Sequence, residues 1–128
     1  MSHIQNLLLC FLFLASNSVG AKDGPDILQI YDQFTTSSAA ASRCIKPDKE
    51  TLNHFLANFQ MVSVYASEEL IKRYPDRTKE QIAGAMKKRS NSITQKIFEL
   101  VREKGCDDPN IQQVVKRFYV QAKWQPGK

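Results

Sequence analysis

The chain is poor in the residues from which most catalytic and cofactor sites are built. Only two of its 128 residues are histidines, and His54 is the only one beyond the N-terminal segment. A Ser-His-Asp arrangement needs a histidine beside a nucleophile and an orienting carboxylate, and the sequence shows no such set. Glycine-rich phosphate loops, zinc spacings, calcium loops and the haem attachment motif are all absent. We therefore predict no enzyme, no cofactor and no metal centre, and we interpret His54 as a surface or core-edge residue.

Charged side chains are missing from residues 1–21, so the rest of the chain carries the whole net charge of +5. Residues 7–15 are uncharged and apolar, and Val19 and Ala21 then fit a signal peptidase site before Lys22. The apolar run is too short to cross a bilayer, which takes about 20 apolar residues. We expect a signal peptide over residues 1–21, no transmembrane anchor, and export to the periplasm or the extracellular space. The alternative is a buried N-terminal core helix.

Cysteine is scarce as well, and only Cys44 and Cys106 lie within the predicted mature domain of residues 22–128. An even number of cysteines in an exported domain favours a disulfide formed in an oxidising compartment. Closing a loop of about 60 residues would stabilise the fold by roughly 4 kcal/mol in the chain-entropy model. The alternative, a metal or redox pair, lacks the close cysteine spacing of such sites. We therefore predict a single domain with one disulfide, Cys44–Cys106.

Apolar residues recur at helical spacing in four stretches, and no alternating run is long enough to indicate a strand. Pro47, Pro75 and Gly105 lie at the breaks between stretches. We predict helices over residues 25–43, 48–74, 78–104 and 109–123. Connections of about three to six residues make consecutive helices antiparallel neighbours. The predicted fold is therefore an all-α, four-helix up-down-up-down bundle, in which Cys44 and Cys106 lie at the same pole.

Local signals support the predicted helix ends and faces. Thr78 and Gln81 have the spacing of a capping box, and Asp108 precedes Pro109 as a cap followed by a first helical residue. Small residues at positions 37–42 favour either close packing against a neighbour or fraying. On the second helix, the residues expected to face the core include Leu52, Phe55, Leu56, Val62 and Ala66.

The second helix also has apolar residues outside that face, namely Met61, Val64, Tyr65 and Ile71. A central helix in contact with two neighbours explains this width. The alternative is a hydrophobic groove that accepts a partner helix or an acyl chain.

Basic residues concentrate in the second half of the chain, where Lys87, Lys88 and Arg89 are consecutive. Such a region steers a domain toward an anionic partner, and a solvated helix face is the alternative. Predicted export, and the lack of aromatic residues within the basic run, argue against nucleic acid. Tyr119 and Trp124 are candidate interface aromatics, or they cover the open end of the core. These five residues are the candidate partner-binding set, and the expected partner is another protein with an acidic surface.

An apolar leader followed by a short helical bundle with one disulfide resembles several groups of small bacterial envelope proteins. These are immunity proteins that neutralise periplasmic toxins, acid-stress chaperones and secretion pilotins. A pilotin is usually a lipoprotein, whereas Cys10 lies inside the apolar run and not at a cleavage site. The resemblance is one of overall form and carries over no functional residue. It implies a non-enzymatic exported module that holds or occludes a partner protein. A carrier of a small apolar or amphipathic ligand is the alternative, because the second helix has a wide apolar surface.

Overall fold

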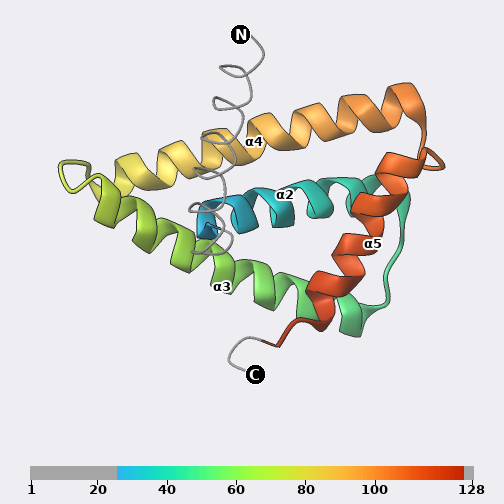
Figure 1. Cartoon of the computed structure of the whole chain (residues 1–128), viewed down its shortest axis with the longest axis horizontal. Coiled ribbons are helices and arrows are strands. Elements are labelled where there is room, and N and C mark those ends of the chain that lie inside the picture. Colours follow the sequence, from blue (N-terminus) through green and yellow to red (C-terminus); the bar gives the residue numbers. More distant parts are fainter. Residues whose placement is uncertain (1–25, 126–128) are drawn as a thin grey trace, which may run out of the picture.

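A computed structural model describes residues 26–125 of the protein, which form four α-helices joined by short connections (Figure 1). None of these residues lies in a strand. The helices are α2 (Ile27–Cys44), α3 (Lys49–Arg73), α4 (Lys79–Lys104) and α5 (Pro109–Lys123), and each bound lies within two residues of the predicted one. The predicted all-α, up-down-up-down topology is confirmed. The predicted signal peptide lies outside the described residues.

Each helix begins at a side-chain oxygen that accepts a hydrogen bond from a backbone N–H of the first turn. The capping residues are Asp26, Asp48, Thr78 and Asp108. Thr78 and Gln81 form the predicted capping box, in which Gln81 Oε1 accepts from the Thr78 N–H at 2.9 Å. The Leu28 N–H and the Arg73 guanidinium, which both donate to Asp26, lower the pKa of its carboxyl group.

Helix α2 is the central element, because it packs extensively against α3, α4 and α5, whereas the contact of α3 with α4 is small. Figure 1 shows α3 and α4 diverging from the turn that joins them, with α2 between them and α5 crossing the wide end. The second helix, α3, contacts two neighbours closely as expected, namely α2 and α5, but α2 is the helix that lies between the others. The small residues of α2 explain the difference, since Ser37, Ala39, Ala40 and Ala41 are all buried and allow close approach by neighbouring helices. The stretch at positions 37–42 is therefore a packing surface.

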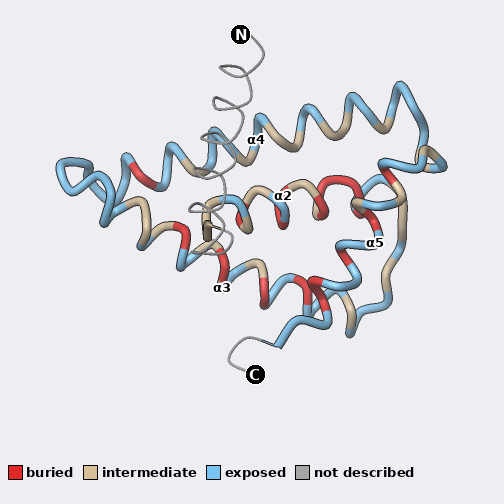
Figure 2. Tube along the Cα trace, viewed as in Figure 1, coloured by how far each residue is buried: buried red, intermediate tan, exposed pale blue. Residues whose placement is uncertain are grey.

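Aromatic rings fill the core between α2, α3 and α5. The Phe55 ring lies 4.3 Å from the Phe118 ring and 5.4 Å from the Phe34 ring, measured between centroids. In Figure 2 the buried segments lie mainly on α2, α3 and α5, and Ile82 is the one buried residue of α4. The core thus joins three helices tightly, while α4 packs through a partly buried face.

Part of the predicted apolar face of α3 is wrong. Phe55, Val62 and Ala66 are buried as expected, but Leu52 and Leu56 are exposed. Because α3 and α4 diverge from the turn that joins them, part of the surface of α3 is left without a neighbouring helix (Figure 1).

The predicted disulfide is present. Cys44 and Cys106 are bonded, with their Cα atoms 5.5 Å apart. The bond joins the last residue of α2 to the connection between α4 and α5, at the predicted common pole. It therefore fixes the end of the molecule at which α3 and α4 are farthest apart and α5 crosses.

Two glycines offer a matched pair of stability tests. Gly84 lies inside α4 and Gly105 follows its end with φ of 81°, and a Cβ at either position would meet no atom of the described residues within 4 Å. Gly84→Ala is expected to raise the free energy of unfolding by about 0.5–1 kcal/mol, because alanine is the better helix former. Gly105→Ala is expected to lower it by about 1 kcal/mol, because an L side chain strains a left-handed residue. Urea denaturation measures both, and shifts of the same sign would contradict the conformation at Gly105.

Candidate partner-binding groove between α2 and α5

One side of α2 is left uncovered, because α4 and α5 make little contact with each other. Gln29 and Gln33 of α2 are exposed on this side. Next to them, α2 and α5 enclose an open groove of about 520 Å³, hereafter the α2–α5 groove. Its lining residues are Ile30, Gln33, Phe34, Arg117, Val120, Gln121, Lys123 and Trp124. Its volume exceeds that of three other surface hollows, one beside Ile97, one beside His54 and one beside Met86.

Helical spacing places the apolar residues of the groove in two short rows. Ile30 and Phe34 are one turn apart on α2. Val120 lies on α5, and Trp124, which caps the C-terminus of that helix, follows four positions later. Val120 is 69% exposed, more than any other large hydrophobic residue described, and Trp124 is 41% exposed. Two exposed apolar residues at one helix edge are therefore available to a partner.

A buried amide fixes the end of α5 that carries Trp124. Asn58 Nδ2 donates to the carbonyl oxygens of Gln121, at 2.8 Å, and Trp124, at 2.9 Å. The Gln121 carbonyl lies in the last turn of α5, where it also accepts from the Trp124 N–H at 3.3 Å, and the Trp124 carbonyl lies just beyond the helix. The Trp124 ring also packs against Phe34, with 6.2 Å between centroids. The groove wall is thus held from α3 as well as from α2.

Sequence reasoning missed Asn58. Its signal is a polar residue at helical spacing from the buried Phe55 and Val62, which marks a core position that must find hydrogen-bond partners. The partners, the carbonyls of Gln121 and Trp124, lie more than 60 positions away along the chain, so the pattern alone does not identify them.

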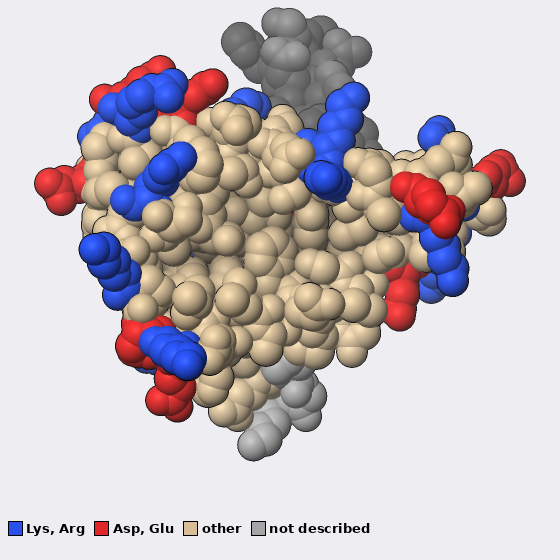
Figure 3. Space-filling model, turned by 180° about the vertical axis from the view of Figure 1, so that it is seen from behind, with Lys and Arg blue, Asp and Glu red and all other residues tan. Residues whose placement is uncertain are grey.

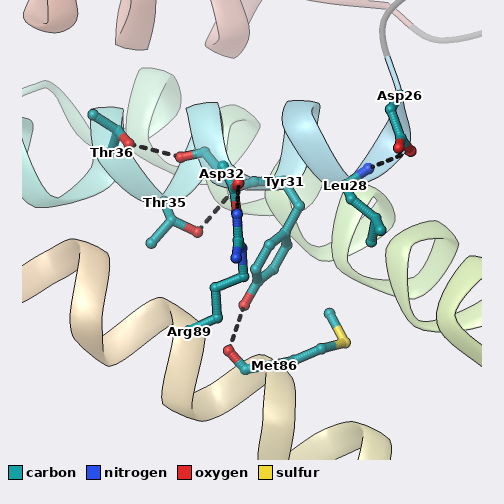
Figure 4. Close-up of polar contacts among 8 residues, drawn as sticks. All are labelled: Asp26, Leu28, Tyr31, Asp32, Thr35, Thr36, Met86 and Arg89. Carbon is teal, nitrogen blue, oxygen red and sulfur yellow. Dashed lines mark hydrogen bonds and ion pairs between the residues drawn. The ribbon is translucent and has the colours of Figure 1, made fainter.

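Cationic side chains border the α2–α5 groove. Arg117 and Lys123 line it, and no acidic residue of the described chain does so. Asp32 of α2 is engaged by Arg89, whose Nε donates to Asp32 Oδ1 at 2.7 Å and whose second nitrogen donates to Oδ2 (Figure 4). Asp32 thereby raises the pKa of the Arg89 guanidinium. The groove therefore favours anionic groups at its α5 edge.

The five predicted partner-binding residues do not form one surface. Lys87, Lys88 and Arg89 are exposed, but consecutive residues of a helix point about 100° apart, so they do not share a face. Arg89 is committed to Asp32, and the same part of α4 accepts a hydrogen bond from the Tyr31 hydroxyl at the Met86 carbonyl, 3.4 Å away (Figure 4).

Of the two predicted interface aromatics, only Trp124 lines the α2–α5 groove. Tyr119 does not line the groove, and its ring packs edge-on against Phe118 with centroids 5.5 Å apart. Trp124 does line it, together with Arg117, Val120 and Lys123, which sequence reasoning did not single out. Their spacing along α5, at positions 117, 120 and 124, is the signal that was present and not used.

Charge is unevenly distributed over the molecule. Figure 3 shows the face opposite to the view of Figure 1, where the middle is uncharged and the Lys, Arg, Asp and Glu side chains gather toward its ends and upper edge. The concentration of basic residues in the second half of the sequence therefore does not produce a continuous basic surface on this face. The groove, with its two cations, is a more local feature.

The wide apolar surface of α3 is only partly covered. Helix α3 packs against α2, α4 and α5, and Met61 is partly buried. Val64, Tyr65 and Ile71, by contrast, lie at the surface. None of the three lines the α2–α5 groove. His54, also on α3, is exposed beside Ala57 and Lys123 at the rim of a smaller hollow.

None of the helices within residues 26–125 is long and apolar enough to cross a membrane. Across the same range, no three His, Cys, Asp or Glu side chains gather in a group that would hold a metal ion.

Comparison with known proteins found no matching family model, no matching curated protein and no matching solved structure.

Proposed function

We propose that this protein is a non-enzymatic, exported module of the bacterial envelope or extracellular space that holds or occludes a partner protein. The observation that supports this most strongly is the α2–α5 groove, in which exposed Val120 and Trp124 lie beside cationic Arg117 and Lys123. Exposed aromatic and aliphatic anchors bordered by charge are typical of protein-binding surfaces.

Two features support the compartment. The disulfide Cys44–Cys106 is expected in an oxidising environment such as the periplasm or the extracellular space. The apolar run of residues 7–15, with Val19 and Ala21 at the spacing of a signal peptidase site, is the predicted export signal. The same disulfide limits the motion of α5 relative to α2, and so keeps the groove preorganised for a partner.

A ligand carrier fits the described residues less well. Carrier sites bury roughly 70–90% of a small ligand, which requires an enclosed cavity. Here the space between α2, α3 and α5 is occupied by the stacked rings of Phe34, Phe55 and Phe118, and the α2–α5 groove is open to solvent. A small apolar ligand would therefore lie in this open groove, or in a smaller apolar hollow of about 130 Å³ lined by Ile97, Ile111 and Val114.

A matched pair of valine variants tests the proposal. Val120→Glu places a charge in the groove, whereas Val64→Glu makes the same change at an exposed position of α3, outside it. Immobilised wild-type protein and Val64→Glu are expected to retain the same protein from an envelope or culture extract, and Val120→Glu is expected to lose it. Equal retention by all three variants would contradict binding through the groove.

Native mass spectrometry of the purified protein separates this proposal from the carrier function. A binding module gives the mass of the mature chain with one disulfide. A stoichiometric extra mass of a small apolar molecule, lost in Val120→Glu, would support the carrier instead.

A further inference from the structure

Resting on the proposed function, we propose that the α2–α5 groove binds an amphipathic helix of a partner protein, with its apolar stripe on Val120 and Trp124 and its acidic flank at Arg117 and Lys123. Three features of the groove support this occupant. They are the spacing of its apolar residues, the charge at its edge and an unpaired acceptor in the groove wall.

The spacing of the apolar rows matches a helix. Ile30 and Phe34 on one wall, and Val120 and Trp124 on the other, are each four positions apart, the spacing of one helical turn. Recognition of a helix in a groove uses anchors at positions i, i+3 or i+4, and i+7 of the partner, which repeat at the same distance. An extended peptide would instead add to an exposed sheet edge, and residues 26–125 contain no strand to receive it.

The charge at the groove edge favours acidic residues beside the apolar stripe of the partner helix. Arg117 and Lys123 lie on the same helix and line the groove, and neither has an ion-pair partner among the described residues. The nearest acidic group on α2, Asp32, is instead paired with Arg89. A partner with Asp or Glu beside its apolar stripe would form charge-assisted hydrogen bonds with the groove edge, whereas Lys or Arg there would be repelled.

An unpaired acceptor supplies the third reason. Gln121 is 7% exposed and lines the groove, and its Oε1 is buried with no hydrogen-bond partner among the described residues. A buried acceptor without a donor is unfavourable, and native structures rarely leave one. If the Gln121 side chain rotated toward the groove, its Oε1 would accept a hydrogen bond from a side-chain donor on the partner helix.

The experiment uses the single tryptophan of the chain as its reporter, because Trp124 lies in the groove. Two synthetic helical peptides are compared, both with the same leucine stripe, one flanked by glutamate and the other by lysine. The glutamate peptide is expected to shift Trp124 emission to shorter wavelength, as the half-exposed ring becomes buried, and to bind at least about ten-fold more tightly than the lysine peptide.

Charge reversal at the groove edge provides the specific test. Arg117→Glu is expected to remove the preference for the glutamate peptide, or to reverse it, with a loss of about ten-fold or more in its affinity. Lys116→Glu is the control, since Lys116 is exposed, adjacent in sequence and outside the groove lining. Preserved circular dichroism and melting temperature show that both variants are folded.

Three results would overturn the inference: no change in Trp124 emission with either peptide, equal affinity for the two peptides, or equal effects of Arg117→Glu and Lys116→Glu. Capture of the natural partner then separates failure of the helix-binding inference from failure of the proposed function. If the peptides do not bind but Val120→Glu still abolishes capture of the natural partner, the groove binds a protein in another form. If Val120→Glu also leaves capture unchanged, the proposed function fails as well.

Discussion

Replacing Phe55 by alanine is expected to lower the free energy of unfolding by about 3–5 kcal/mol, as is typical for a buried phenylalanine. Phe55 is 0% exposed, and its ring contacts those of Phe34, Phe59 and Phe118 at centroid distances of 5.4, 5.9 and 4.3 Å. The substitution therefore opens a cavity where α2, α3 and α5 meet. Urea denaturation followed by helical circular dichroism measures the loss.

The neighbouring residue provides the control for Phe55→Ala. Leu56 is 49% exposed on the same turn of α3, and Leu56→Ala is expected to cost about 1 kcal/mol or less. If the two variants lost equal stability, the orientation of α3 in the bundle would be wrong. The comparison is informative because the sequence pattern places both residues on the predicted core face.

Removal of the disulfide is expected to have a similar effect. The double variant Cys44→Ser, Cys106→Ser should lose about 2–5 kcal/mol, because the bond closes a long loop in the unfolded chain. For a domain of this size that corresponds to a decrease of roughly 10 °C or more in the melting temperature. Thermal unfolding followed by circular dichroism measures it, and the wild-type protein treated with reductant should melt close to the double variant.

Thiol titration checks that Cys44 and Cys106 are bonded in the wild-type protein. The denatured wild-type protein, purified from an oxidising compartment, should contain no free thiol at Cys44 or Cys106. Free thiols at Cys44 and Cys106, together with an unchanged melting temperature in the double variant, would contradict a structural disulfide.

Much of the fold was predictable because its signals are local. A capping box at Thr78, a cap at Asp108 and a glycine at position 105 mark helix ends within a few residues of sequence, and the structure contains all three. Short connections then fix the antiparallel order of α2, α3 and α4, and with it the common pole of Cys44 and Cys106.

Which helix lies in the centre was not predictable from apolar patterning. Helix α3 has the wider apolar surface in sequence, yet Val64 and Tyr65 are exposed. Helix α2 is central because Ala39, Ala40 and Ala41 allow close approach, and small residues contribute little to a hydrophobic pattern. Which residues are buried depends on how the helices pack together, and the apolar pattern of one helix does not determine that packing.

The candidate site was predictable only in part for the same reason. Trp124 stands out in sequence as an aromatic residue near the C-terminus, but its neighbours in the groove depend on how α5 crosses α2. The pairing of Arg89 with Asp32, 57 positions away, likewise depends on the packing of α4. That surface ion pair partly neutralises one of the predicted partner-binding cations.

Site-specific photocrosslinking in the producing cell examines the α2–α5 groove under natural conditions. A photoreactive phenylalanine analogue replaces Val120 in the full chain, and the same analogue at Val64 serves as the control, since both valines are exposed and only Val120 lines the groove. We predict one dominant crosslinked protein from position 120, attached through an acidic amphipathic helix, and none from position 64. The same products from both positions, or none from position 120, would contradict a partner-binding role for the groove.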